Sequence, residues 1–311
     1  MKKNELNVIF SSDDNYAQHM GVAIYSLLQN NQLFKRIMIY IIDNEISEDN
    51  KKYVLNIISQ FENAKLEWVD FNNWKNKLSL KMGKWSISIS SYARLFIGSM
   101  LGTDVDRILY LDCDMLILES LYDLWNSDMQ GNTIAAVQDT IGDSTKKSVG
   151  VIESRKYFNA GMLLIDLDRW RYLEMEKKCL QFIDEKKGNV THHDQGVLNG
   201  IVNGKFKRLP LEYNLMTIHY IWPINKIIKY YGESSQFYSE KEISLAKENP
   251  IIIHFTPSFT TRPWVENCKH PQRNIYWQYL EKTPWKGKKA EKSSEKWYVK
   301  LINWRYRTLG V

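Results

Sequence analysis

The sequence predicts an α/β fold whose core is a mixed, mostly parallel sheet. Over the first 70 residues, buried strands at 7–10, 36–42 and 65–70 alternate with helical patterns at 19–29 and 47–61. This order is typical of parallel strands joined by right-handed helical crossovers. With 311 residues, 44% of them hydrophobic, the chain is long enough to bury a sizeable core.

The first strand, Asn7–Phe10, runs into the polar segment Ser11–Tyr16 before the first helix begins. Ligands bind doubly wound sheets at the carboxyl ends of the strands. Asp13 and Asn15 are therefore candidates for contacts with a base or ribose, although the same residues serve equally well as helix caps. In the second helix, Ser47 is the expected N-cap.

Two carboxylates follow the apolar run Ile108–Leu111, at Asp112 and Asp114. If the chain stays extended there, both side chains point the same way, roughly 7 Å apart. Burying two carboxylates is costly without a partner. A Mg²⁺ or Mn²⁺ ion that also carries a diphosphate is a natural one. A capped turn is an equally good interpretation of this pattern.

Two further Asp-x-Asp pairs differ in context. Asp104 and Asp106 precede the strand and indicate a solvated turn. Asp168 stands just before the helix expected at 170–186, where it is a candidate N-cap. The pair 112/114 alone lies between two apolar runs.

Other polar or small residues interrupt apolar segments farther along. Arg94 is expected early in a helix, which hints at an anionic partner or a salt bridge, and Asp194 is a candidate N-cap. Ala160 and Gly161 allow a ligand to approach the backbone closely, or form a plain turn. His254 ends the last short strand, either as a core side chain or as a third metal ligand.

The net charge of +6 belongs to the C-terminal tail. From Glu281 to Val311 there are nine Lys or Arg and three acidic residues, so the rest of the chain is balanced, which argues against a nucleic-acid-binding surface. Trp297, Leu301 and Trp304 fall near one face of a predicted helix. A basic helix with an aromatic face suits an anionic membrane surface, and a helix packed on the body is the alternative.

The three widely spaced cysteines form neither a disulfide framework nor a zinc motif, which indicates a reducing compartment. The N-terminus has no signal-peptide pattern, and no apolar run approaches the length of a membrane span. We therefore expect a cytoplasmic protein, peripheral on the inner face of the cell membrane if the tail binds lipid.

Six short motifs occur in one order along the chain and together resemble glycosyltransferase family 8, in particular its bacterial lipooligosaccharide α-1,4-galactosyltransferases. The similarity covers about residues 5–280. The motifs are Phe10-Ser-Ser-Asp-Asp-Asn-Tyr, Ile87-Ser-Ile-Ser-Ser-Tyr-Ala-Arg-Leu, Ile108-Leu-Tyr-Leu-Asp-Cys-Asp-Met, Tyr157-Phe-Asn-Ala-Gly-Met-Leu-Leu-Ile, His193-Asp-Gln-Gly-Val-Leu-Asn and His254-Phe-Thr with Arg262-Pro-Trp.

The resemblance implies a GT-A catalytic domain at 1–280, followed by the tail at 281–311. It implies a retaining hexosyltransferase that uses UDP-galactose or UDP-glucose with Mn²⁺ or Mg²⁺ and acts on a glycan acceptor carried by lipid or protein. Asp112, Asp114 and His254 would hold the metal. The base and ribose would contact Ser11, Asp13, Asn15 and the backbone of Cys113; the donor sugar would be surrounded by Arg94, Asp139, Asn159, Ala160, Gly161, Asp194 and Gln195.

Within this set, Gln195 would lie beneath the anomeric carbon and Asp194 would bind sugar hydroxyls. The chain departs from the family pattern at Ser86, where a histidine is usual, and in the last motif, where Pro257 replaces Gly and Arg262 replaces Lys after two extra residues. Arg262 can still clasp a phosphate, with a different geometry.

The uncharged amide of Gln195 is a poor nucleophile, which favours front-face attack by the acceptor over double displacement. An apolar strand ending in Asp-x-Asp also suits a phosphohydrolase with an aspartyl nucleophile. A non-catalytic sugar-binding module would use the abundant aromatic residues but leaves Asp112, Asp114 and His254 unexplained.

Overall fold

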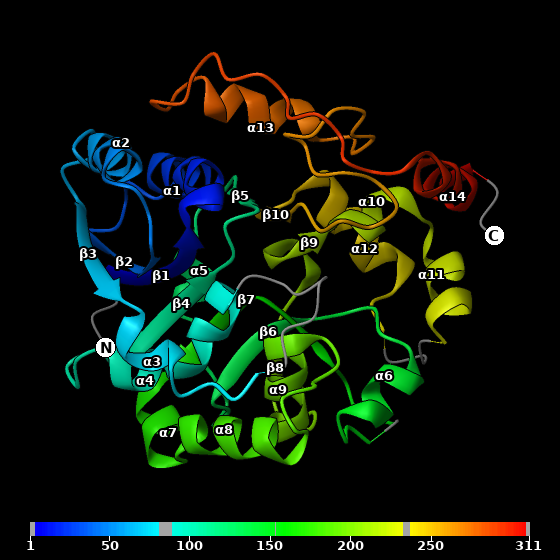
Figure 1. Cartoon of the computed structure of the whole chain (residues 1–311), viewed down its shortest axis with the longest axis horizontal. Helices are drawn as coiled ribbons and strands as arrows, with labels where there is room; N and C mark the ends of the chain where they lie inside the picture. Colours follow the sequence, from blue (N-terminus) through cyan, green and yellow to red (C-terminus); the bar gives the residue numbers. More distant parts are fainter. Residues whose placement is uncertain (1–3, 81–88, 153, 233–236, 309–311) are drawn as a thin grey trace.

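The computed structural model describes residues 4–80, 89–152, 154–232 and 237–308. Its centre is a seven-stranded sheet in which β7 is antiparallel to both of its neighbours and the other adjacent pairs are parallel (Figure 1). This confirms the predicted mixed, mostly parallel sheet. From edge to edge the strands are β3 (Ala64–Asp70), β2 (Arg36–Asn44), β1 (Glu5–Asp13), β4 (Arg107–Leu111), β7 (Phe158–Asp166), β6 (Ile134–Gln138) and β8 (Lys207–Arg208).

A second sheet of three short strands continues the chain beyond β4. Its central strand pairs antiparallel with one neighbour and parallel with the other. In order, the strands are β5 (Met115–Ile117), β10 (Ile252–His254) and β9 (Leu215–Met216). The short link between β4 and β5 therefore joins the two sheets.

Helices cover both faces of the large sheet (Figure 1). On one face lie α1 (Ala17–Asn30) and α2 (Glu48–Ile58), with α13 (Arg273–Leu280) packed on α1. On the other lie η2 (Ile89–Phe96), α4 (Ile97–Met100), α7 (Leu167–Tyr172), α8 (Met175–Glu185) and α9 (His193–Val202).

The remaining described elements are short connecting helices and one last helix, which lies within the C-terminal tail. They are η1 (Asp14–Tyr16), α3 (Asn72–Lys75), α5 (Tyr122–Trp125), α6 (Asp143–Ser148), η3 (Leu211–Tyr213), α10 (Thr217–Ile221), α11 (Ile224–Tyr231), α12 (Glu240–Glu248) and α14 (Trp297–Thr308).

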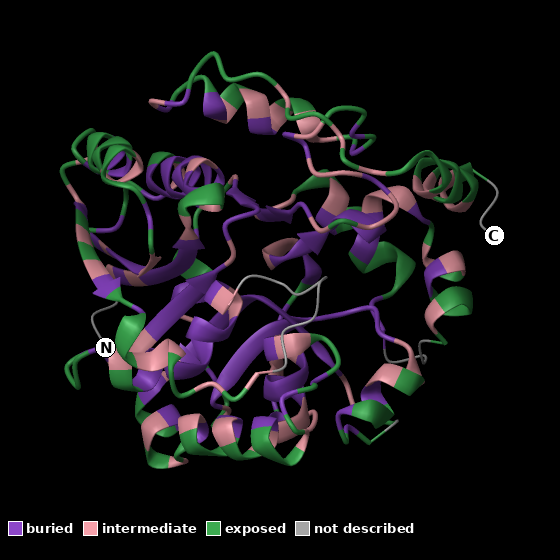
Figure 2. Ribbon diagram, viewed as in Figure 1, coloured by how far each residue is buried: buried purple, intermediate pink, exposed green. Residues whose placement is uncertain are grey.

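Strand β4 shows why the sheet is buried on both sides. Ile108 and Tyr110 belong to the core beneath α7, α8 and α9, whereas Leu109 and Leu111 belong to the core beneath α1. All four are buried (Figure 2). A strand covered on both faces has a continuous apolar sequence rather than an alternating one.

Local caps agree with the sequence in one helix and differ in two others. Ser47 caps α2, as predicted, by accepting a hydrogen bond from the backbone N–H of Asn50. The cap of α7 is Asp166 rather than Asp168, because the helix begins at Leu167, before the aromatic residues that suggested its start. Asp194 is not a cap: it lies in the first turn of α9, and its carboxylate pairs with Arg94.

Two other helix predictions were wrong. The helix expected at 170–186 is divided into α7 and α8, because Glu174 has a left-handed backbone with φ 52°. Arg94 lies in the last turn of the 3₁₀ helix η2 rather than early in an α-helix. Ser86 and Ile87 lie outside the described residues.

The tail that follows Glu281 is anchored in the body through Trp285. This side chain is buried, and its ring lies directly over Gly21 of α1. A Cβ atom at Gly21 would clash with three ring atoms, among them Cη2 at 2.7 Å. Because Gly21 has no side chain, the ring of Trp285 can pack directly against α1.

We expect Gly21→Ala to lower the free energy of unfolding by about 1–3 kcal/mol, because overpacking outweighs the better helix propensity of alanine. Urea denaturation measures the change. In a Trp285→Ala background the same substitution should cost little, and an equal cost in both backgrounds would contradict this packing.

Candidate active site

A cavity of about 650 Å³ opens where β1 and β4 end and β7 begins. Its wall contains every residue predicted for the site except Asn15, which is exposed and lines a neighbouring groove. The predicted residues in the wall are Ser11, Asp13, Arg94, Asp112, Cys113, Asp114, Asp139, Asn159, Ala160, Gly161, Asp194, Gln195, His254 and Arg262.

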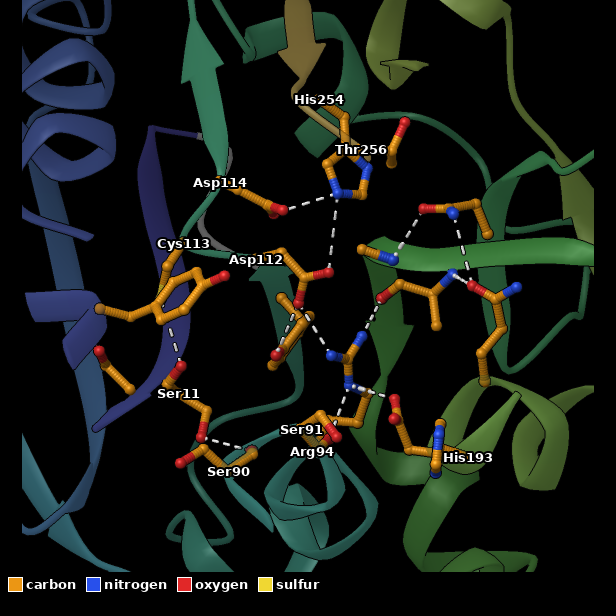
Figure 3. A pocket seen from close by; sticks show the side chains of 18 of the residues that line it. Ser11, Ser90, Ser91, Arg94, Asp112, Cys113, Asp114, His193, His254 and Thr256 are labelled. Carbon is orange, nitrogen blue, oxygen red and sulfur yellow. Dashed lines mark hydrogen bonds and ion pairs between the residues drawn. The ribbon is translucent and has the colours of Figure 1, made fainter. Parts of the chain in front are cut away.

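Asp112, Asp114 and His254 converge at one point of this cavity (Figure 3). Their ligand atoms lie within 4.8 Å of one another. His254 Nε2 is 3.1 Å from Asp114 Oδ1 and 3.9 Å from Asp112 Oδ2. Two carboxylates and an imidazole form a donor set that fits Mn²⁺ or a similar divalent cation.

The convergence is not the strand geometry that the sequence suggested. Strand β4 ends at Leu111, and the two aspartates lie on the short turn to Met115, where β5 begins. The turn brings their oxygens closer together than two positions on one face of a strand would be. His254 enters from β10, which pairs with β5.

A chain of amides orients His254. Asn159 donates from Nδ2 to Asp139 Oδ2 (3.1 Å), and Asn214 Nδ2 donates to Asn159 Oδ1 (2.9 Å). His254 Nδ1 lies 3.0 Å from Asn214 Oδ1, so Nδ1 carries the hydrogen and Nε2 faces the carboxylates. Such a partner fixes the tautomer and direction of a metal-binding histidine.

Gly161 makes room for this group. A Cβ atom there would lie 2.9 Å from Asp112 Oδ2 and would also clash with the ring of His254. The backbone N–H of Asp112 donates to the Gly161 carbonyl at 2.8 Å, which holds the turn against β7. The small residues 160 and 161 suggested that a ligand comes close to the backbone, or that the chain turns there. In the structure, the side chains of Asp112 and His254 lie against the backbone of Gly161.

Positive charges compensate the two carboxylates, of which Asp114 is buried and Asp112 partly buried. Burial and the nearby Asp114 charge raise the pKa of Asp112, although Arg94 opposes this. Burial also disfavours the charged form of Asp114, but His254 and Arg262 outweigh it and lower the pKa of that group. For His254, burial favours the neutral ring, and the two carboxylates outweigh it and raise the pKa.

Arg94 links the turn that carries Asp112 and Asp114 to the opposite wall. Its Nη2 lies 2.8 Å from Asp112 Oδ1 and its Nε 2.9 Å from Asp194 Oδ2, while Nη1 donates to the Ala160 carbonyl. The guanidinium also packs 4.2 Å from the ring centre of Tyr110. The sequence suggested that Arg94 either binds an anionic partner or forms a salt bridge. The structure shows a salt bridge, in which the Arg94 side chain is buried.

Gln195 is held at both ends of its amide. Its Oε1 accepts from the Ala160 N–H at 2.9 Å, and its Nε2 donates to Asp139 Oδ2 at 2.9 Å. Two residues shortly before Gln195 have left-handed backbones, His192 (φ 60°) and His193 (φ 53°). These strained residues turn the chain into α9 so that Asp194 and Gln195 face the cavity.

Residues at the end of β1 form the other wall of the cavity. Ser11 donates from Oγ to the Ser90 carbonyl at 2.7 Å, and Cys113 Sγ donates to the Ser11 carbonyl at 3.2 Å. Asp13 accepts from the Tyr16 N–H and caps η1, so the capping interpretation holds for a residue that also lines the cavity.

Comparison with known proteins decides the family. The sequence profile described as "Glycosyl transferase family 8" matches residues 7–268. The chain belongs to glycosyltransferase family 8. It is a transferase, as predicted, and the interpretations as a phosphohydrolase or a non-catalytic sugar-binding module are set aside.

Individual members of family 8 agree over most of the chain. General stress protein A of Bacillus subtilis is 31% identical over 291 residues, which is 92% of this chain and 96% of that protein. The lipopolysaccharide 1,2-glucosyltransferase of Escherichia coli is 28% identical over 285 residues, 90% of this chain and 79% of the relative. The structure of galactosyltransferase LgtC with donor and acceptor sugar analogues superimposes with a TM-score of 0.73 at 25% identity, covering 90% and 96% of the two chains.

Sequence reasoning missed Asn214, because a single asparagine at the end of an extended segment carries no recognisable motif. It also missed Tyr110, which donates from its hydroxyl to Asp112 Oδ1 at 3.0 Å and appeared only as part of an apolar run. Alternation along β4 offered a signal, since residue 110 lies on the same face as residue 112.

We expect Asn214→Leu to weaken Mn²⁺ binding by about 10–100-fold, because His254 loses the partner that orients it. Titration followed by electron paramagnetic resonance of free Mn²⁺ measures the affinity. Asn199→Leu is the matched control, since Asn199 is equally buried but bonds the backbones of Phe158 and Gln195 rather than His254 or either aspartate. Equal affinities in the two variants would contradict the role of Asn214.

Proposed function

We propose that the protein transfers galactose or glucose from a UDP-sugar to a hydroxyl of a glycan acceptor on lipid or protein, with retention at the anomeric carbon. The observation that carries the proposal is the convergence of Asp112, Asp114 and His254 in a cavity whose far wall holds Gln195. A galactosyltransferase and a glucosyltransferase among the similar proteins support a hexose as the transferred group.

In this proposal the nucleoside lies against the end of β1. Ser11, Asp13 and the backbone of Cys113 line that wall and offer acceptors and donors for uracil and ribose. Asn15 stays a candidate only at the rim, because it lines the neighbouring groove. Arg262, whose planar guanidinium matches phosphate geometry, would reach the diphosphate.

Asp112, Asp114 and His254 would hold the divalent cation, which supplies Lewis-acid stabilisation of the charge that develops on the leaving diphosphate. Arg94 pairs with Asp112 and opposes the rise of its pKa, and Asn214 orients His254 through a hydrogen bond to Nδ1. Asp194 and Asn159 would hydrogen-bond hydroxyls of the donor sugar, beside the backbone of Ala160 and Gly161.

The engagement of Gln195 supports front-face attack. Both ends of its amide already bond Ala160 and Asp139, so it is fixed as a positioning group. Asp194, the adjacent carboxylate, is paired with Arg94. The acceptor hydroxyl would then attack from the side of the leaving diphosphate, whose oxygen takes the proton.

We expect a panel of UDP-sugars with Mn²⁺ to show UDP release with UDP-galactose or UDP-glucose, and Asp112→Asn to lower that rate at least about a hundredfold, since a metal is worth several kcal/mol to the leaving group. A coupled UDP assay measures hydrolysis without the acceptor. Asp168→Asn, in the exposed Asp-x-Asp pair, should retain the wild-type rate. Full metal-dependent release by Asp112→Asn would contradict the proposal.

We further propose that α14 places the enzyme on the inner face of the cell membrane. Trp297, Leu301 and Trp304 are 76, 53 and 51% exposed and lie on a helix within the basic tail. Cationic charge and an apolar face together favour an anionic lipid surface. Within the described residues no helix is sufficiently long and apolar to span a bilayer.

Replacing both Trp297 and Trp304 with alanine should abolish cosedimentation with vesicles that contain anionic lipid, while UDP release in solution stays at the wild-type rate. Tyr172→Ala is the control, because Tyr172 is an 85% exposed aromatic residue on α7. If the double variant sediments as the wild type does, the membrane proposal is wrong.

A further inference from the structure

The loop that carries Arg262, residues 256–265, is held on both sides by the C-terminal tail. The loop leaves β10 immediately after the metal-site residue His254 and brings Arg262 back to the cavity. There the guanidinium Nε lies 3.0 Å from Asp114 Oδ2. We call this segment the Arg262 loop.

Before Arg262, the loop is held in a cluster of three aromatic rings. Phe259 stacks on Trp222 (4.4 Å between ring centres, 24° between planes) and on Tyr306 of α14 (5.0 Å, 25°), while Trp222 and Tyr306 also contact each other at 6.3 Å. The side chain of Arg307 also donates to the Phe259 carbonyl. Phe259 has φ 54°, a left-handed conformation that a bulky residue adopts only when its surroundings impose it.

After Arg262, the loop pairs with the tail through its backbone. The N–H of Glu291 donates to the Trp264 carbonyl, and the N–H of Glu266 donates to the Glu291 carbonyl, each at 2.8 Å. Val265 and Glu291 form an isolated parallel bridge. Arg262 therefore stands between two attachment points that both belong to the tail.

The position of Arg262 depends on how its loop is held. On the far side the ring of Trp264 also stacks on His19, and the Pro263 carbonyl accepts from Trp277 Nε1. The attachment through Phe259 is therefore the one that depends most on the tail.

The side chain of Arg262 is 28% exposed, and its guanidinium lies 5.9 Å from the ring centres of Tyr16 and Trp264. A long, flexible side chain loses rotamer entropy when it is held in one place, so a shift of its backbone readily costs the contact with an anionic group.

We propose that α14 is part of the donor site, and that Tyr306 positions Arg262 for the donor diphosphate through the stack on Phe259. The inference rests on the proposed use of a UDP-sugar. Tyr306 is a positioning residue, which acts through the Arg262 loop. The tail then has two faces, one toward the exposed surface and one that holds the loop.

The test measures UDP affinity in the presence of Mn²⁺ by isothermal titration calorimetry, using the full chain. Tyr306→Ala should weaken UDP binding about tenfold or more and raise the donor KM more than it lowers kcat, because a misplaced cation loses ground-state binding. Tyr306→Phe, which keeps the stacked ring, should bind UDP as the wild type does.

A double-mutant cycle separates positioning from general destabilisation. In an Arg262→Ala background, Tyr306→Ala should cost no further UDP affinity, whereas additive losses would overturn the inference. Phe259→Gly relieves the backbone strain but removes the ring, so it should resemble Tyr306→Ala; wild-type affinity in Phe259→Gly would also overturn it.

The two proposals fail in different ways. Wild-type protein that binds no UDP with Mn²⁺ would overturn the proposed function and this inference with it. Wild-type protein that binds UDP, together with Tyr306→Ala that binds it equally well, would overturn the positioning role alone.

Discussion

The site depends on the compensation of two neighbouring carboxylates, one buried and one partly buried. Asp112 and Asp114 follow an apolar strand, where Asp114 is buried and the side chain of Asp112 is 25% exposed, so their charges need partners. Arg94 pairs with Asp112, and both His254 and Arg262 pair with Asp114. These three residues come from η2, β10 and the loop after β10, so one electrostatic requirement ties together segments more than a hundred residues apart.

The fold brings these segments together at one edge. Strands β1 and β4 run parallel and end at the same edge of the large sheet, and β7 begins there because it runs the opposite way. The second sheet then brings β10 against β5, directly after the turn that carries Asp112 and Asp114. In Figure 3 the donor set and the Arg94 network accordingly lie on opposite sides of Asp112.

The sequence predicted the strands and helices of the first 70 residues because their patterns are local: continuous apolar runs for strands buried on both faces, and Ser47 as a cap. It could not show that the turn after Leu111 folds the aspartates together, or that Asp194 faces Arg94 rather than its own helix end. Those features depend on tertiary packing. Six ordered motifs contain the predicted residues that line the cavity, apart from Asp139, whereas the contacts of Asn214 and Tyr306 depend on geometry that no local pattern carries.

The most direct measurement is anomalous diffraction from crystals soaked with Mn²⁺ and UDP, recorded at the manganese edge. Our account predicts one strong peak within coordination distance of Asp112, Asp114 and His254 Nε2, with diphosphate oxygens on its open side. A peak elsewhere, or UDP bound with those three side chains away from the metal, would contradict it.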